Sequence, residues 1–281
     1  MTDVQLGKLY LVGTPIGNLE DITLRAIRTL KEVDLIAAED TRRTGKLLQH
    51  LEVSTPQISY HQHSPDSRIE ELTEKLQQGK NIAVVTDAGM PSISDPGVKL
   101  VQAAIALSID VIPIPGGTAV ISALAVSGLA TDKFIFEGFL PLKETERQAR
   151  LELLRSEART VVLYEAPHRI VKTLTDLRNI AGKEREIVLA RELTKMHEEF
   201  WRGTVDEAIA LYNKRQPKGE YTLVLKGAAE TELIMSEAEL RVELQQLLDR
   251  GITRSQASRQ LAKSTTLSRR EIYQLDLEAD C

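Results

Sequence analysis

The stretch LYLVGTPIGN, residues Leu9 to Asn18, decides the fold. Its first four residues are apolar and have the length of a buried strand, whereas Gly13 and Pro15 are typical of a loop. The segment from Asp21 to Leu30 follows, with apolar residues at helical spacing and an acidic start. A strand, a small-residue loop and a helix in this order predict the first unit of an α/β fold.

The same order repeats along the first half of the chain. Further strands are predicted at Val33–Ala38, Asn81–Thr86 and Val111–Ile114. Helices are predicted at Ser67–Gly79, where a Ser-x-x-Glu start resembles a capping box, and at Pro96–Leu107. Regular alternation of strand and helix indicates a largely parallel sheet.

The second half continues with strands and helices, but its strands have closer, hairpin-like spacing. Helices are predicted at Thr118–Gly128, Lys143–Arg159 and Val205–Tyr212. Strands are predicted at Phe134–Phe139, Thr160–Tyr164, Glu186–Ala190 and Tyr221–Lys226. We therefore expect an N-terminal α/β domain over residues 1–116 and a second α/β domain over residues 117–228.

The composition is that of a soluble globular protein. The chain has 281 residues, of which 42% are hydrophobic and 27% charged, and its formal net charge is −5. The single cysteine is Cys281, so we expect no internal disulfide and a reducing compartment. The start has no secretory signal, and the most apolar stretch, Val120–Ala130, is shorter than the ~20 residues that span a bilayer. These features predict a cytoplasmic protein with no membrane association.

The last part of the chain differs in composition and in predicted element length from the two α/β domains. A Glu-rich linker at Ala229–Glu232 precedes three short predicted helices at Ser236–Asp249, Thr253–Lys263 and Ser268–Leu277. Three short helices with a turn at Gly251 resemble a helix-turn-helix module, which we place at residues 233–281.

Positive charge is concentrated in this module. Between Thr253 and Arg270 there is no acidic residue and there are five basic ones, namely Arg254, Arg259, Lys263, Arg269 and Arg270. Serines and threonines separate them, and this pattern is suited to phosphate contacts. It predicts an RNA-binding module, with a solvated helical surface as the alternative.

Three predicted strands lead into loops of small residues, proline and glycine. These loops are Gly13–Asn18, Asp87–Gly97 and Pro115–Thr118. In an open α/β sheet, ligands bind beyond the carboxyl ends of the strands, where glycine allows close approach of the backbone. The loops therefore predict a ligand site, although each one alone could be an ordinary turn.

Motifs of other ligand classes fit poorly. Gly13 and Gly17 lack the spacing of a dinucleotide fingerprint, and no serine or threonine follows Lys46 as a P-loop requires. His61 and His63 share the face of a strand, but no third ligand is evident nearby, so we expect no metal site. Phe200 and Trp201 are interpreted as core residues.

Six motifs together resemble the ribosomal RNA small subunit methyltransferase I family, over roughly residues 7 to 279. They are Gly13–Ile22, Ala38–Arg42, Asp87–Pro91, Ser94–Gly97, Tyr164–Arg169 and Leu189–Lys195. The resemblance implies the two-domain fold of tetrapyrrole methylases, called class III S-adenosylmethionine methyltransferases. It implies 2′-O-methylation of a cytidine of 16S rRNA, near the decoding centre of the small ribosomal subunit. It also implies a homodimer.

The resemblance places the S-adenosylmethionine donor in the cleft between the two domains. The contacts that it implies are Thr14, Pro15, Gly17, Asp87, Ala88, Gly89, Met90, Thr118, Ala119, Leu163 and Tyr164. Met90 stands where many members have threonine, and Gly117-Thr118 replaces a more usual Pro-Ser pair. Backbone contacts would survive both changes, whereas a hydroxyl contact at Met90 would not.

A ribose hydroxyl is a weak nucleophile and must lose its proton as the new bond forms. We consider Asp40, with its neighbour Glu39, and also Glu165 and His168 as candidate catalytic residues. Candidates for holding RNA phosphates in this part of the chain are Arg42, Arg43, Arg169 and Arg191, with Lys195 as a further cation. Structural ion pairs Asp40–Arg42 and Glu165–Arg169 are the alternative.

Two other functions compete with this one. A corrin-ring methylase would share the catalytic scaffold but would not need a basic C-terminal module. A non-enzymatic regulator would join a small-molecule α/β domain to DNA-binding helices. Against it, the C-terminal helices lack an obvious set of base-reading side chains.

Overall fold

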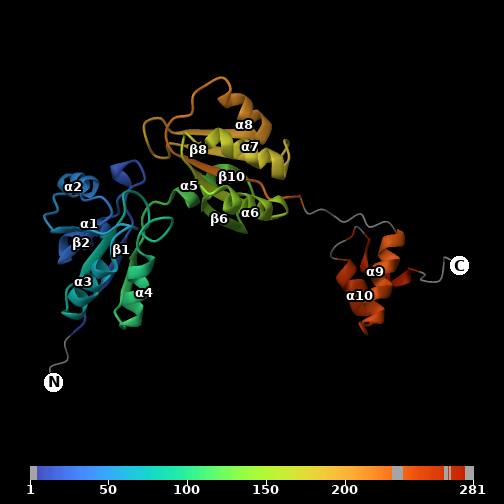
Figure 1. The fold of residues 1–281 in the computed structure, drawn as a ribbon, viewed down its shortest axis with the longest axis horizontal. Coiled ribbons are helices and arrows are strands. Elements are labelled where there is room, and N and C mark those ends of the chain that lie inside the picture. Colours follow the sequence, from blue (N-terminus) through green and yellow to red (C-terminus); the bar gives the residue numbers. More distant parts are fainter. Residues whose placement is uncertain (1–4, 230–236, 263–264, 266, 276–281) are drawn as a thin grey trace. The chain divides into compact units, whose positions relative to one another are not determined.

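The computed structural model describes residues 5–229, 237–262, 265 and 267–275. Contacts divide the chain into two compact units, residues 1–227 and 228–281, which we describe separately (Figure 1). Within the described residues, no helix is long and apolar enough to cross a membrane. Lys263, Cys281 and most of the predicted linker Ala229–Glu232 lie outside the described residues.

The first sheet is entirely parallel, as predicted, and its strands have the order β3-β2-β4-β1-β5. Its strands are β1 (Leu9–Val12), β2 (Leu35–Ala38), β3 (Gln57–Ser59), β4 (Ile82–Val85) and β5 (Val111–Ile114). The helices of this first lobe, residues 5–116, are η1 (Leu19–Asp21), α1 (Leu24–Glu32), α2 (Thr41–His50), α3 (Asp66–Gln77) and α4 (Val98–Ala106).

Helices cover both faces of this sheet. Ile36 and Val85 pack with α1 and α2 on one face, while Leu9 and Val84 pack with α3 and α4 on the other. A strand buried on both faces must be apolar throughout, and all four residues of β4 are buried. The carboxyl ends of the parallel strands, with their loops, therefore lie together at one edge.

The second sheet is mixed and has the order β6-β7-β10-β8-β9. Only β6 and β7 are parallel, which agrees with the hairpin-like spacing. The strands are β6 (Phe134–Phe139), β7 (Thr160–Glu165), β8 (Glu186–Arg191), β9 (Glu199–Thr204) and β10 (Tyr221–Leu225). The helices of this second lobe, residues 117–227, are α5 (Ala119–Ser127), α6 (Glu144–Arg155), α7 (Ile170–Ala181) and α8 (Val205–Tyr212).

One face of the second sheet packs against α6, α7 and α8, and the other packs against α5. The helix α5 begins at Thr118, whose hydroxyl accepts a hydrogen bond from Ile121 N, and ends at Gly128 with a left-handed φ of 80°. Phe200 packs on the α5 side and Trp201 on the opposite side, and both are partly buried against the core that was predicted to contain them.

Among its described residues, the C-terminal unit contains three helices that share a core of their own. Its helices are α9 (Glu237–Asp249), α10 (Arg254–Leu261) and α11 (Arg269–Gln274). Complete capping boxes start two of them, with Thr253 and Gln256 at α10 and Ser268 and Glu271 at α11. Leucines of α9 pack against residues of the other two helices, including Ala257 and Ile272.

Several predicted boundaries were wrong. Ser67 does not cap α3, because the helix already begins at Asp66 and its N-cap is Pro65, which makes no side-chain hydrogen bond. The acidic residue Asp21 belongs to a separate short 3-10 helix, and Thr23 caps α1 instead. The sequence analysis also missed α2, β3, α7 and β9 as separate elements, although α2 and α7 have an apolar face at helical spacing.

Candidate active site

Two loops at the carboxyl edge of the first sheet are joined by a short antiparallel bridge. Thr14 N donates to Gly89 O over 2.9 Å, and Gly89 N donates to Thr14 O over 3.1 Å. The Thr14 hydroxyl donates to Thr86 O at 3.1 Å. Thr14 is therefore buried in the wall, where it fixes the β1 loop to the β4 loop.

The β1 and β5 loops touch through glycine backbones. A Cβ built on Gly13 would lie 2.7 Å from the Cα of Gly116 and 2.7 Å from Met90 Sδ. In the reverse direction, a Cβ on Gly116 would lie 2.8 Å from Gly13 Cα. Both distances are far shorter than a carbon–carbon contact, so this approach needs glycine at both positions.

A cavity of about 480 Å³ opens beside these loops, and residues of both lobes line it. That volume lies within the range of small-molecule sites. The apolar lining includes Ile16, Ala88, Met90, Ala119, Leu193 and Phe139. The charged lining consists of Glu39, Arg43, Asp87, Asp95, Glu165, Lys195 and Glu220.

Seven of the eleven residues expected to contact the cofactor line this cavity, namely Asp87, Ala88, Gly89, Met90, Thr118, Ala119 and Tyr164. Of the remaining four, Thr14 and Pro15 are buried at the bridge, and Gly17 is exposed beside Lys195. Leu163 is fully buried and its side chain packs on the α7 side of the second sheet. The predicted loops therefore converge, although not every predicted side chain reaches the cavity.

Asp87 is a cavity carboxylate with one paired and one unpaired oxygen. Its Oδ2 lies 3.0 Å from Arg43 Nη1, and its backbone N–H donates to Glu39 Oε2 over 3.1 Å. Its Oδ1 is buried and has no hydrogen-bond partner among the described residues. Desolvation raises the pKa of this carboxyl, and the charge of Arg43 opposes that rise. An unpartnered buried oxygen is a place where a ligand N–H or O–H group would be stabilised.

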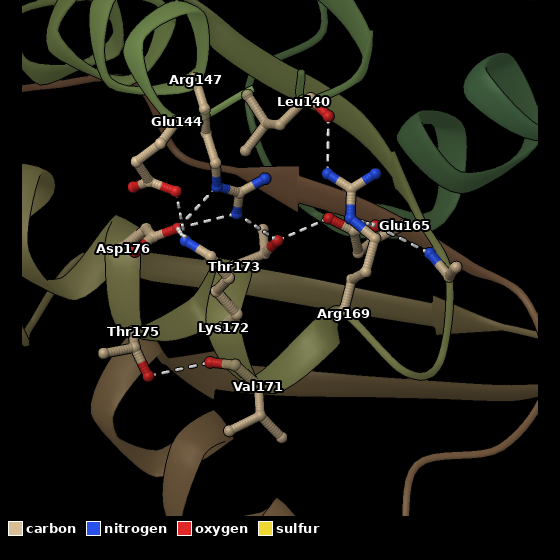
Figure 2. Close-up of polar contacts among 11 residues, drawn as sticks. Leu140, Glu144, Arg147, Glu165, Arg169, Val171, Lys172, Thr173, Thr175 and Asp176 are labelled. Atoms are coloured by element: carbon tan, nitrogen blue, oxygen red, sulfur yellow. Dashed lines mark hydrogen bonds and ion pairs between the residues drawn. The ribbon is translucent and has the colours of Figure 1, made fainter. Parts of the chain in front are cut away.

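Glu165, a predicted catalytic residue, belongs to a buried polar network (Figure 2). Its carboxylate accepts from the Thr173 hydroxyl and over 2.9 Å from Ala166 N, and Arg169 Nε lies 3.3 Å away. Arg169 donates to Leu140 O over 2.6 Å. The Glu165–Arg169 ion pair considered above is therefore present, and Arg169 is turned toward protein atoms.

The network continues through Arg147, which no sequence pattern singled out. Its Nε donates to Asp176 Oδ2 over 2.8 Å, and its Nη2 donates to Thr173 Oγ1 over 2.8 Å. The Arg147 side chain is only 2% exposed. This arrangement ties α6 and α7 to Glu165 at the end of β7 (Figure 2), and Glu165 lines the cavity.

Of the other proposed bases, Glu39 lines the cavity and accepts a hydrogen bond from Asp87 N, whereas Asp40 and His168 do not line it. Asp40 accepts from Arg42 Nε over 3.1 Å and from Arg42 Nη2 over 2.7 Å, and these bonds hold the pKa of Asp40 well below its usual range. A carboxylate in that state is a weak base. His168 is exposed on the turn before α7. Neither structure nor comparison tests these roles, and they stay predictions.

Some of the candidate RNA-binding arginines are engaged by other residues of the chain, whereas others are exposed. Arg191 Nε pairs with Glu199 over 3.0 Å, and the guanidinium of Arg254 donates to Tyr273 O over 3.0 Å and also to Leu275 O. Arg269 donates to Ser255 Oγ over 2.8 Å but is exposed, as are Arg259 and Arg270. Arg254 therefore holds the module together, and the exposed arginines of α10 and α11 are the ones open to a partner.

Sequence reasoning missed Asp95 as a functional candidate, although its loop was noted. Asp95 lines the cavity, and burial together with the charges of Glu39 and Asp87 raises its pKa to about 7. The available signal was an Asp-Pro pair within a strand-exit loop. That pattern cannot show that the carboxylate lacks a counter-ion.

Known proteins resemble this chain closely. Residues 8–209 match the family model described as tetrapyrrole (corrin/porphyrin) methylases. A protein of Synechocystis named ribosomal RNA small subunit methyltransferase I is 59% identical over 276 residues, which cover 98% of this chain and 99% of that protein. A protein of the same name from Thermotoga maritima is 51% identical over 222 residues, covering 79% of this chain and 99% of that protein.

A solved structure shows the same fold at low identity. It is the uroporphyrin-III C-methyl transferase of Thermus thermophilus, complexed with S-adenosylhomocysteine. It has 18% sequence identity and a TM-score of 0.58, and the match covers 78% of this chain and 97% of that one. From the identity and coverage of its relatives, this chain belongs to the ribosomal RNA small subunit methyltransferase I family, within the tetrapyrrole methylases.

Proposed function

We propose that this chain methylates ribosomal RNA of the small subunit and uses S-adenosylmethionine as the methyl donor. The acceptor is the ribose 2′-hydroxyl of a cytidine of 16S rRNA near the decoding centre. The observation that carries the proposal is the 59% identity, over 98% of the chain, to a protein named for this class of reaction. The fold alone would not select RNA over a tetrapyrrole, because the similar solved structure is named as a methyltransferase of uroporphyrin-III.

The cavity suits a donor with apolar, polar and cationic parts. When bound, S-adenosylmethionine supplies a methyl group activated by attachment to a positively charged sulfur. The apolar lining from Ile16 to Leu193 offers contacts for a nucleoside base, and the unpartnered Oδ1 of Asp87 offers an acceptor for hydroxyl or amino hydrogens. Carboxylates in the lining favour a cation, and the glycine loops let the backbone approach the ligand closely.

The chain's main contribution to such a transfer is orientation. A displacement at carbon requires the attacking oxygen, the methyl carbon and the sulfur to be in line, and holding that geometry is worth up to about 7–11 kcal/mol. Rigid walls support it here, because the bridge at Thr14 and the network behind Glu165 fix both sides of the cavity. Phe139, half exposed in the lining, offers a face on which an unstacked base could lie.

Exposed arginines of the C-terminal module, namely Arg259, Arg269 and Arg270, supply phosphate contacts in this proposal. Lys263, which lies outside the described residues, belongs to the same predicted set. The proposal also includes a homodimer in the cytoplasm. Both features come from the family resemblance and from the single-cysteine composition.

The decisive experiment incubates the protein with tritiated S-adenosylmethionine and small subunits that lack their modifications. We expect label in 16S rRNA at one cytidine, and we expect the phosphodiester after it to resist alkaline cleavage, because that cleavage needs a free 2′-hydroxyl. Label on a base atom would contradict the proposed acceptor. Label on a tetrapyrrole, with none on the subunit, would contradict the proposed substrate class.

Substituting alanine for Gly13 should weaken binding of S-adenosylhomocysteine at least tenfold. The added Cβ would lie 2.7 Å from the Gly116 backbone, so the β1 and β5 loops would have to separate. Calorimetric titration measures the affinity, and circular dichroism checks the fold. The matched control is Gly45→Ala in α2, where the nearest atom to the new Cβ is 3.4 Å away and affinity should not change. Unchanged affinity in the Gly13 variant would show that these loops do not hold the donor.

A further inference from the structure

One carboxylate of the cavity has no partner of its own. Among the described residues, nothing donates a hydrogen bond to Asp95 and no cation pairs with it. The two cations that line the cavity already pair with other carboxylates. Arg43 pairs with Asp87, and Lys195 pairs with Glu192 over 2.9 Å and with Glu220 over 2.8 Å. Asp95 thus faces the cavity with its proton-accepting oxygens available.

A strained loop holds Asp95 in this position. Ser92 and Ser94 adopt left-handed φ angles of 74° and 60°, which are uncommon for residues other than glycine. The loop is closed by a 3.0 Å hydrogen bond from Ser92 N to Pro96 O, and Pro96 restricts the backbone of Asp95 to extended conformations. Strain of this kind persists where surrounding structure holds a functional geometry.

The loop is also fixed against the second lobe. A Cβ on Gly138 of β6 would lie 2.9 Å from Ser94 Oγ, so the two segments are in close contact. Gly97 is equally confined, because its Cβ would lie 2.2 Å from Ser92 Oγ. Asp95 is therefore presented at the junction of the lobes by a rigid turn.

The electrostatic surroundings favour the protonated form of Asp95. Burial, then the charges of Glu39 and Asp87, raise the pKa of this carboxyl to about 7. A base with a pKa near the working pH is the most effective proton acceptor. The titratable groups that share the cavity with it are Glu39, Arg43, Asp87, Tyr164, Glu165, Lys195, Glu220 and Tyr221.

The other carboxylates near the site are less suited to this role. Glu165 accepts hydrogen bonds from Thr173 and Ala166, and its side chain has no exposed surface. Asp87 is paired with Arg43, and Asp40 is held by both guanidinium nitrogens of Arg42 that face it. Pairing with Arg42 holds the pKa of Asp40 well below its usual range, whereas burial raises the pKa of Asp87, whose Oδ2 is already occupied by Arg43. Glu39 accepts a hydrogen bond from Asp87 N, and Glu220 pairs with Lys195.

We propose that Asp95 is the general base that accepts the proton of the acceptor ribose 2′-hydroxyl. This inference rests on the proposed function. As the hydroxyl oxygen forms its bond to the methyl carbon, the carbon–sulfur bond breaks and its electron pair remains on sulfur. The hydroxyl proton passes to a carboxylate oxygen of Asp95 and is afterwards released to solvent. Charge balances, because a cationic donor and an anionic base both become neutral.

The same environment gives a test that does not depend on catalysis. An acid whose pKa is higher in the folded than in the unfolded state stabilises the fold below its unfolded pKa, near 3.8, and this stabilisation is lost as the pH rises through the folded value, about 7. Asparagine cannot ionise. Asp95→Asn should therefore raise the unfolding temperature relative to the wild type at pH 8, and raise it much less at pH 5.

The experiment compares wild type, Asp95→Asn and the exposed control Asp132→Asn in single-turnover methylation of small subunits at saturating donor. We expect the rate of Asp95→Asn to fall about 100-fold or more, the low end of general base catalysis, with donor affinity within about threefold. The wild-type rate should rise with pH up to about 7 and then level off. The Asp132→Asn variant should behave as the wild type.

Three results would overturn the proposal. One is a wild-type rate in Asp95→Asn, and another is a loss of donor affinity with no change in rate at saturation, which would make Asp95 a binding residue. The third is an unfolding temperature of Asp95→Asn that follows the wild type at both pH values. If the wild-type chain labels no small subunits, the proposed function fails, and the role of Asp95 fails with it.

Discussion

Replacing Arg147 by alanine should lower the free energy of unfolding of the second lobe by about 3–5 kcal/mol, the usual effect of breaking a buried ion pair by removing one partner. The guanidinium is almost fully buried and satisfies both Asp176 and Thr173. Its removal leaves the largely buried Asp176 with a weaker partner, Lys172, whose Nζ lies 3.4 Å away. Urea unfolding followed by the fluorescence of Trp201, the only tryptophan, measures the loss.

The matched control lies on the same helix. Arg155 pairs with Glu152 three residues earlier, and both side chains are more than half exposed. Exposed pairs contribute little, so Arg155→Ala should change stability by no more than about 0.5 kcal/mol. Equal effects of the two substitutions would show that the network behind the cavity is not a structural support.

The network behind Glu165 contains contacts that the sequence pattern could not indicate. The motif Tyr164–Arg169 correctly indicated a special segment at the end of a strand. Glu165 and Arg169, however, turn toward Thr173, Leu140 and the Arg147 cluster, and Arg147 lies 22 positions before Arg169 in the chain. Such pairing depends on how α6 packs against α7, which no local pattern encodes.

Other parts of the fold could be predicted because local chemistry decides them. The run Leu9–Val12 is apolar because helices bury both faces of β1, and the glycines at 13 and 116 are required by the backbone contact between two loops. Boundaries such as the start of α3 could not be predicted, since Ser67 offers a capping hydroxyl that the structure does not use. Asp95 was missed for a different reason. No cation pairs with Asp95 among the described residues, and a local sequence pattern cannot indicate that a carboxylate will lack a counter-ion.

The Thermotoga relative bears on the role of the C-terminal module. Almost its whole length matches this chain at 51% identity, yet the match leaves about a fifth of this chain uncovered. The compact unit 228–281 amounts to a similar share. From this similarity in share we expect that donor binding and transfer need only the two lobes and that the module adds affinity for the substrate.

A chain that ends at Ala228 should therefore keep its affinity for S-adenosylhomocysteine and lose about 10- to 100-fold in affinity for small-subunit RNA. Each lost phosphate contact reduces the dependence of log affinity on log salt by about 0.7–0.9, so the truncated chain should also show a shallower salt dependence. Filter binding at several salt concentrations measures both quantities. Loss of donor binding would instead mean that the module supports the fold of the lobes.

Within the full-length chain, Arg259 and Arg270 should account for a substantial share of that loss. Both are exposed, and no hydrogen bond or ion pair to other described residues occupies them, whereas Arg254 must stay because it joins α10 to the end of α11. The double substitution Arg259→Ala with Arg270→Ala should reduce the salt slope by about 1.4–1.8 if each contacts one phosphate. A pair of equal charge on the lobes, Lys31→Ala with Lys133→Ala, should leave the slope unchanged. If the two pairs lower the slope equally, binding follows net charge, and the module is not a specific RNA contact.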